Sequence, residues 1–507
     1  MSNSVRPDDA DQLLIDELLD AAITESSPAI DGLLARLETD AEACEYLLDR
    51  AVLHAGLRQS LRRRSLGDWA VSRAQEDTMA AAARRTLLPL LWTLSVAVCL
   101  ALAMVGWQSL AQPCATVTVG IGTTGLATGK SVGREVHELA AGVLELRTRH
   151  GALVVIEAPA AFRFESPQRL HMTKGRIAAD VPPQAIGFTV VTPSGEAIDL
   201  GTRFAVDVPA SGAAEVHVFD GEVVARDGRN RPTSLRDGEA FSLAANAARE
   251  LRTAAFIRGG EVGQLAAAVA AGQEGLSREA MDRLRDDPTL IAVVDFEGAS
   301  AGNADTIAAG QYRLVQGRWP GSHAADFTHV GDHLPLDLGG AADWPQLTVT
   351  AWVRLDRLGE PYHSLYHTDG WNRQNPGQVH WMIVDSGVMR LALPGWKLTA
   401  EAIEQQGHPE SRTSVLGTEG RWMHLAFVYD AGARTVRFYV DGRPDGVTVL
   451  EDAPPARLGP ARVGNWNNRD RKLSGRMDDL VFIGRALTAD EIRGLYESGL
   501  PYRPHSQ

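Results

Sequence analysis

The carboxylates in this chain do not form a pair at a catalytic spacing. Retaining glycoside hydrolysis, for example, needs two carboxylates about 5–5.5 Å apart. Glu401 and Glu404 come closest in the sequence, but a separation of three residues directs their side chains along a helix or a loop. No Ser/His/Asp spacing typical of nucleophilic catalysis is found either. We therefore expect that the protein is not an enzyme.

Two sets of residues could hold a metal ion. Asp326, Asp332 and Asp478 offer the oxygen ligands that calcium prefers, although each alone is also a common turn residue. His329 and His333 stand four apart, the helical spacing of a zinc pair, but the flanking strand pattern and an intervening glycine indicate a loop. Ca²⁺ is thus the candidate cofactor, with Asp326, Asp332 and Asp478 as its candidate ligands.

Tryptophans are concentrated in the C-terminal part of the chain, where eight of the eleven occur. They are Trp319, Trp344, Trp352, Trp371, Trp381, Trp396, Trp422 and Trp466. Trp371, Trp396 and Trp466 lie among Gly, Asn and Asp, as loop residues do, and such rings can stack on a pyranose. We predict these three as a sugar-binding set, with core packing as the equal alternative. Trp352 and Trp422 lie in alternating strands and are predicted to be core residues.

Composition and length limit the class of protein. A chain of 507 residues has room for about three domains. Its formal net charge of −14 argues against nucleic acid as a partner, because phosphate binding needs a concentrated basic face. Cys44, Cys99 and Cys114 are scattered, which predicts neither a disulfide nor a zinc finger.

Residues 87–111 predict one transmembrane helix. This run has no charged residue and would span about 36 Å as a helix, more than the roughly 30 Å of a hydrocarbon core. Basic residues gather before it, from Arg62 to Arg85, whereas the other flank has none until Lys130. By the positive-inside rule, the chain is expected in the inner membrane with a cytoplasmic N-terminus and a periplasmic C-terminus.

Residues 1–86 predict a small α-helical bundle. Leucines recur at helical spacing, and an acidic stretch precedes the basic flank of the membrane segment. Leu13, Leu14, Leu18 and Leu19 form an apolar stripe wider than one packing partner needs. We predict that this stripe contacts a partner protein; a membrane-proximal bundle without a partner is the alternative.

The remaining chain is predicted to be mainly β, with two domains. Residues 112–245 alternate like half-buried strands, and Asp220–Gly221 between two such strands predicts a type I′ hairpin. Asp199 and Arg203 are read as turn residues rather than as a binding pair. Residues 246–290 are Ala-rich and predict a helical, semi-rigid linker, with helices at about 260–271 and from Ser277.

Residues 291–507 return to the strand pattern and predict an antiparallel β-sandwich. Asp441–Gly442 marks a turn, and Thr488–Ala489–Asp490–Glu491 is a capping box that opens a last helix. The predicted fold class is therefore multidomain and mainly β, with a helical bundle, a membrane helix and a helical linker.

Three segments resemble known families. The arrangement ELLDAAI…IDGLLARLETDAEACEYLLDRAVLHAGL resembles the N-terminal domain of FecR-type anti-sigma regulators, and TPSGEAIDLGTRF with VHVFDGEVVARD resembles the FecR domain itself. VTAWVRL, GRWMHLAFVYD, RFYVDGR and MDDLVFIGRALTADEI resemble the LamG/concanavalin A-like jelly roll. Glycosidases on that fold use a Glu-x-Asp-x-Glu strand, which this chain lacks.

The resemblance implies a regulator that binds an extracytoplasmic-function sigma factor inside the cell and relays an outside signal. Its jelly roll would bind a carbohydrate or a protein. The alternative is a membrane-anchored carbohydrate-binding, adhesion or scaffold protein without a sigma-factor partner.

Overall fold

In the computed structural model the chain divides into two compact units, Met1–Leu110 and Ala111–Gln507. The structure describes residues 112–297, 310–339, 342–372, 374–405, 407–466 and 471–501. The predicted bundle at 1–86, with its leucine stripe, and the predicted membrane helix at 87–111 lie outside the described residues. Among the residues that are described, no helix is long and apolar enough to cross a membrane.

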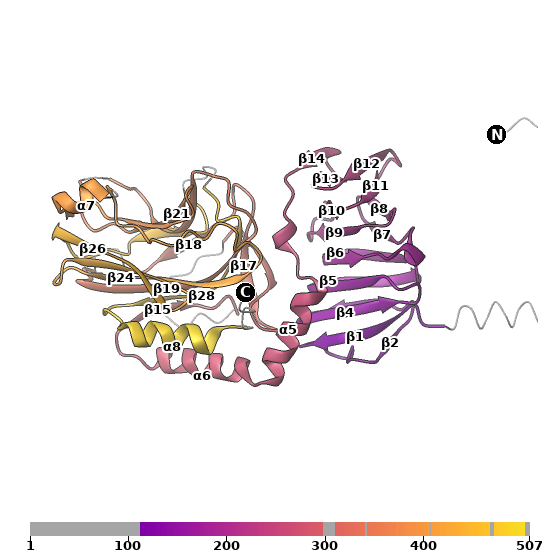
Figure 1. The fold of residues 1–507 in the computed structure, drawn as a ribbon, viewed down its shortest axis with the longest axis horizontal. Helices are drawn as coiled ribbons and strands as arrows, with labels where there is room; N and C mark the ends of the chain where they lie inside the picture. Colours follow the sequence, from indigo (N-terminus) through magenta and orange to yellow (C-terminus); the bar gives the residue numbers. More distant parts are fainter. Residues whose placement is uncertain are drawn as a thin grey trace, which may run out of the picture. The chain divides into compact units, whose positions relative to one another are not determined.

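Residues 115–249 form the first β domain, one twisted sheet drawn in indigo to magenta in Figure 1. Its strands are β1 (Ala115–Ile121), β2 (Ser131–Val132), β3 (His137–Leu139), β4 (Val143–Thr148), β5 (Leu153–Ser166), β6 (Arg169–Asp180), β7 (Thr189–Thr192), β8 (Gly195–Asp199), β9 (Arg203–Val208), β10 (Glu215–Asp220), β11 (Glu222–Asp227), β12 (Pro232–Arg236), β13 (Ala240–Ser242) and β14 (Ala247–Arg249). The main path runs β12-β11-β8-β7-β6-β5-β4-β1-β2, and only the β6–β7 pair on this path is parallel. Alternate residues point to a shared core, which explains the period of two in the sequence.

The predicted hairpin at Asp220–Gly221 is wrong. Strands β10 and β11 flank this dipeptide, but β10 pairs with β9 and β13, whereas β11 pairs with β8 and β12. A type I′ turn needs positive φ at both central residues, and here only Gly221 (φ +92°) has it. A Cβ on Gly221 would lie 2.6 Å from Thr202 Cγ2, so the glycine allows a close approach at a corner of the sheet.

The turn reading of Asp199 and Arg203 is confirmed. The Asp199 carboxylate accepts hydrogen bonds from the backbone N–H groups of Gly201 (2.9 Å) and Thr202 (2.7 Å). Arg203 instead pairs with Asp220 at 3.0 Å on the surface. Asp199 therefore fixes a turn, Arg203 forms a surface ion pair beside it, and the two residues do not contact the same partner.

The linker is helical, as predicted, but it is not a free spacer. Helix α5 spans Gly259–Ala270 and helix α6 spans Gln273–Arg285, which starts four residues before the predicted Ser277. Val262 and Leu265 of α5 pack with Val143 and Val155 of the first β domain and with Trp319 of the second. The linker thus belongs to the packed unit.

Residues 290–499 form a β-sandwich of two antiparallel sheets, the predicted jelly roll (Figure 1). The larger sheet has the order β16-β17-β28-β19-β24-β25-β26-β23, with β15 beside β28, and the smaller has the order β18-β27-β20-β21-β22. The strands are β15 (Leu290–Val294), β16 (Arg313–Gln316), β17 (His323–Phe327), β18 (Leu334–Asp337), β19 (Gln346–Leu355), β20 (Tyr362–Thr368), β21 (His380–Val384), β22 (Met389–Ala392), β23 (Lys397–Leu398), β24 (Trp422–Asp430), β25 (Thr435–Val440), β26 (Arg443–Asp452), β27 (Pro460–Val463) and β28 (Gly475–Ile483).

Helices cover the outer face of the larger sheet. Helix α6 and helix α8 (Ala489–Gly499) pack there around a cluster that includes Leu284 and Ile492. Thr488 and Glu491 form the predicted capping box of α8. The short helix α7 (Ala400–Gln405) carries Glu401 and Glu404, so these carboxylates do lie along a helix.

Two further predictions about this domain are confirmed. Asp441 (φ +50°) and Gly442 (φ +72°) both have positive φ and close the hairpin of β25 and β26. Trp352 and Trp422 are buried, with 3% and 4% exposure, and pack with Val315 on the face of the larger sheet away from the sandwich core.

Candidate functional site

Two of the three tryptophans predicted to bind sugar lie together on the smaller sheet. His367 of β20 pairs in register with His380 of β21, and Trp381, next along β21, is buried in the sandwich core. Because successive side chains of a strand point to opposite faces, His380 lies on the face away from the core. The ring centroids of Trp371 and Trp466 lie 3.7 Å and 4.9 Å from that of His380. We call His367, Trp371, His380 and Trp466 the tryptophan–histidine cluster.

The histidines of this cluster are neutral and their rings stack 4.4 Å apart. Burial lowers the pKa of His380 to about 3 and the pKa of His367 well below its usual value. His380 Nε2 donates to the Thr368 carbonyl at 3.1 Å, whereas His367 Nε2 and Trp466 Nε1 are buried without a hydrogen-bond partner among the described residues. Because His367 and His380 are 0% and 4% exposed, these neutral rings pack beneath the two tryptophans.

A guanidinium borders the cluster. Arg471 Cζ lies 4.4 Å from the ring centroid of Tyr362 and 4.8 Å from that of Trp466, which is cation–π geometry. Trp371 and Trp466 are both half-buried, so part of each ring faces outward. An aromatic face can stack on a sugar ring, and a neighbouring guanidinium can donate hydrogen bonds to the hydroxyl groups of that sugar.

Trp396 lies in a different environment. Its ring is 6.5 Å from that of Tyr429, and it packs against the edge of the sandwich core. In the part of the chain that the structure describes, no aromatic contact joins it to the tryptophan–histidine cluster. The core alternative therefore describes Trp396 better than sugar stacking does.

The three aspartates predicted to bind calcium are not brought together. The Asp326 carboxylate is buried and accepts hydrogen bonds from Arg176, Arg313 and Thr328. Asp332 accepts from the backbone N–H groups at positions 328 and 329 and so closes a turn, while Asp478 is buried and accepts from the Arg318 N–H at 3.1 Å. The described residues contain no group of three His, Cys, Asp or Glu that could hold a metal ion. Calcium binding stays a prediction.

Four charged residues lie where the first β domain and the jelly roll are in contact, and the sequence pointed to only one of them, Asp326, as a candidate calcium ligand. Arg176 of β6 is buried between Asp207 of β9 (Nε–Oδ2, 3.3 Å) and Asp326 of β17 (Nη2–Oδ2, 2.5 Å). Arg313 of β16 contacts the same two carboxylates at 2.7 Å and 3.2 Å. Each domain thus contributes one arginine and one aspartate. We call these four residues the junction quartet.

The quartet is fully charged. Burial alone would raise the pKa of Asp207 and of Asp326, but Arg176 and Arg313 hold both well below the usual range. Burial alone would lower the pKa of Arg176, and the two aspartates raise it instead. A carboxyl with a depressed pKa stabilises the fold above its unfolded pKa and loses that contribution only as the pH falls through its folded pKa. The ion pairs of the quartet therefore persist at all but strongly acidic pH.

The linker and a second buried ion pair reinforce this junction. Arg476 of β28 lies 2.8 Å from Glu157 of β5, and it also donates to the Ala255 carbonyl at 2.6 Å. The other oxygen of Glu157 accepts from the Ile257 N–H at 2.7 Å. One carboxylate thus binds both the jelly roll and the linker, so the three segments are joined by buried polar contacts.

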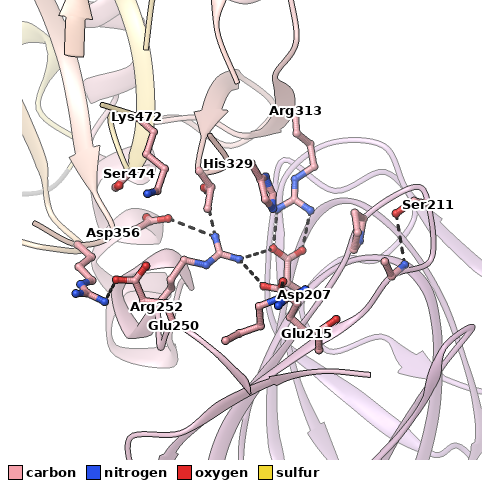
Figure 2. Close-up of a pocket in the computed structure, with 16 residues that line it drawn as sticks. Asp207, Ser211, Glu215, Glu250, Arg252, Arg313, His329, Asp356, Lys472 and Ser474 are labelled. Atoms are coloured by element: carbon pink, nitrogen blue, oxygen red, sulfur yellow. Dashed lines mark hydrogen bonds and ion pairs between the residues drawn. The ribbon is translucent and has the colours of Figure 1, made fainter. Parts of the chain in front are cut away.

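A cavity of about 500 Å³ opens beside the junction quartet (Figure 2). Its polar lining includes Asp207, Glu215, Arg252, Arg313, Asp356, Arg357, Lys472 and Ser474. Arg252 of the linker lies in the cavity wall. Its guanidinium is 3.3 Å from Glu215 and 3.8 Å from Asp356. The first β domain, the linker and the jelly roll all contribute to this cavity.

Comparison with protein families assigns the two domains. Residues 139–224 match the family described as FecR protein. Residues 332–493 match the family described as concanavalin A-like lectin/glucanases superfamily. The chain carries a FecR domain followed by a concanavalin A-like domain. Both resemblances seen in the β-rich part of the sequence are confirmed. No curated protein matches the chain.

Solved structures resemble part of the chain at low identity. The binding domain of Paraclostridial Mosquitocidal Protein 1 is 15% identical with a TM-score of 0.32, and the match covers 42% of this chain and 52% of that one. Domain 4 of AbnA, an extracellular arabinanase from Geobacillus stearothermophilus in complex with arabinotriose, is 18% identical with a TM-score of 0.31 and covers 41% of this chain and 98% of that one. A pentraxin from Limulus polyphemus is 16% identical with a TM-score of 0.25 and covers 32% of this chain and 75% of that one.

Proposed function

We propose that the protein is a single-pass inner-membrane regulator. In this proposal residues 1–86 bind an extracytoplasmic-function sigma factor in the cytoplasm, and residues 112–507 sense a carbohydrate or protein ligand outside. The FecR domain and the concanavalin A-like domain support a signalling regulator with a ligand-binding domain. The observation that carries the proposal furthest is the junction quartet, which joins the two domains through buried charges.

A ligand can change the state of a regulator only through different affinities for its two states. If the concanavalin A-like domain were tethered loosely, ligand bound there would have no energetic connection to the FecR domain. The buried contacts of Arg176, Glu157 and Arg476 make that connection, because moving one domain would expose or break charged pairs. The FecR domain would then respond to what the other domain binds.

The proposed ligand surface is the tryptophan–histidine cluster, and its expected ligand is a carbohydrate. We expect Trp371→Ala and Trp466→Ala each to weaken retention of the full chain on a polysaccharide affinity gel several-fold, since each ring offers a stacking face. Trp396→Ala is the matched control: it should leave retention unchanged and lower the thermal stability. Loss of stability without loss of retention in the first two variants would assign their rings to the core.

The proposal also requires opposite compartments for the two ends of the chain. We expect a reporter enzyme that is active only outside the cytoplasm to be silent when fused at Ser60 and active when fused at Ala245, because the arginines before residue 87 favour the cytoplasm. A reporter active only inside should give the opposite pattern at the same two sites. Activity outside at Ser60 would contradict the layout.

The second candidate function is a membrane-anchored carbohydrate-binding, adhesion or scaffold protein without a sigma-factor partner. The tryptophan–histidine cluster supports either function equally. The packed contact between the FecR domain and the concanavalin A-like domain favours the regulator, because a scaffold has no need of a rigid connection between them. In neither case do we expect catalysis by this chain.

A further inference from the structure

Asp356 is a buried carboxylate directly after strand β19. Its backbone N–H donates to the Ser474 carbonyl at 2.8 Å, which fixes the residue against the start of β28. Its side chain is 0% exposed and lines the cavity beside the junction quartet (Figure 2). The fold therefore holds this acid at the cavity wall.

Neither oxygen of the Asp356 carboxylate accepts a hydrogen bond from any residue that the structure describes. The Arg252 guanidinium is 3.8 Å from Oδ2, which is ion-pair distance but beyond a hydrogen bond. Asp207 and Asp326, by contrast, are hydrogen-bonded by arginines. A buried carboxylate without donors is strongly unfavourable, so Asp356 needs donors that a ligand can supply.

The surroundings of Asp356 restrict the chemistry of such a ligand. Basic side chains (Arg252, Arg357 and Lys472) and acidic side chains (Asp207, Glu215 and Glu250) both line the cavity, so it favours neither a bare ammonium group nor a bare anion. A hydroxyl group satisfies both kinds of neighbour, because it donates one hydrogen bond and accepts others.

We propose that this cavity binds a small polyhydroxylated molecule, a sugar or sugar acid of one or two rings, whose hydroxyl groups donate to Asp356 and accept from Arg252. Its volume of about 500 Å³ is in the range of small-molecule sites. A ligand here would contact the FecR domain, the linker and the concanavalin A-like domain together. The binding is independent of the sigma factor, but its signalling role rests on the proposed function.

The test is calorimetric titration of the purified full-length chain with D-glucose, D-galactose, D-glucuronate and D-galacturonate in turn. We expect at least one of them to bind the wild-type chain, and Asp356→Asn to weaken that binding at least tenfold. The same substitution should raise the melting temperature of the ligand-free chain, because it removes a buried charge without donors. Asp343→Asn, which alters a half-exposed acid paired with Arg457, is the control and should bind like the wild type.

Two outcomes would overturn the proposal. If none of the four compounds binds the wild-type chain, the proposed site is refuted. Binding that survives Asp356→Asn but is lost in Trp371→Ala would place the sugar on the tryptophan–histidine cluster, which would refute the cavity as its site while leaving the proposed function in place.

Discussion

Arg176→Met is expected to lower the free energy of unfolding of residues 112–507 by about 3–5 kcal/mol, the usual cost of removing one partner from a buried ion pair. Arg176 is 3% exposed and forms ion pairs with Asp207 and Asp326, whose side chains are 4% and 2% exposed. Methionine keeps most of the aliphatic part of the side chain and removes the guanidinium and its charge. Arg313 still contacts both aspartates, so the loss should be partial rather than complete.

Tryptophan fluorescence during denaturant unfolding of the full-length chain measures this loss, because eight of the eleven tryptophans lie in residues 291–507. Arg203→Met is the matched control: Arg203 and Asp220 form an ion pair with 56% and 58% exposed side chains, so its removal should cost less than about 1 kcal/mol. Asp326→Asn should lower the free energy of unfolding less in the Arg176→Met background than in the wild-type chain, because the two residues interact. Equal effects of Arg176→Met and its control would refute the role of the quartet.

Leu14→Asp or Leu18→Asp is expected to abolish capture of a sigma factor by the full-length chain. These residues lie outside the described part of the structure, and the prediction rests on the leucine stripe of residues 13–19. A carboxylate placed in a desolvated helix-in-groove contact has no partner and costs far more than the lost leucine contact alone. The measurement is co-purification from solubilised membranes, quantified against the amount of chain recovered.

Asp16→Asn provides the control for these variants. On a helix, residue 16 is about 160° from residues 14 and 18 and about 60° from residues 13 and 19, so the charge changes by one unit off the leucine stripe. This variant should capture the sigma factor as the wild type does. Circular dichroism of each purified variant must show unchanged helix content, because a misfolded bundle would also fail to bind. Capture that survives both leucine substitutions would exclude the stripe as the contact.

Local patterns predicted the elements of the fold better than their connections. The capping box at Thr488 and the turn at Asp441–Gly442 appear as expected, because each depends on neighbours in sequence. Asp220–Gly221 has the same dipeptide but joins strands with different partners. Its glycine is needed for a close approach to Thr202, a contact that no local pattern reports.

Local sequence patterns also could not predict which distant residues come together in the candidate sites. Trp371 and Trp466 converge on His380 across segments that are far apart in sequence, whereas Trp396, in a similar loop context, packs against the core edge. Arg176 and Asp326 are 150 residues apart; Arg176 looks like an ordinary charged residue in a strand, and Asp326 was predicted as a calcium ligand rather than as an ion-pair partner. Only the packing of the two domains shows that these charges are buried together.

Capture of a sigma factor by the wild-type full-length chain from membranes of its own cell tests the proposed function most directly. We predict that one extracytoplasmic-function sigma factor is enriched in the captured material and that the Leu14→Asp chain does not enrich it. A chain that is recovered folded, with residues 112–507 outside the membrane, yet captures no sigma factor would contradict the regulator and leave the scaffold function.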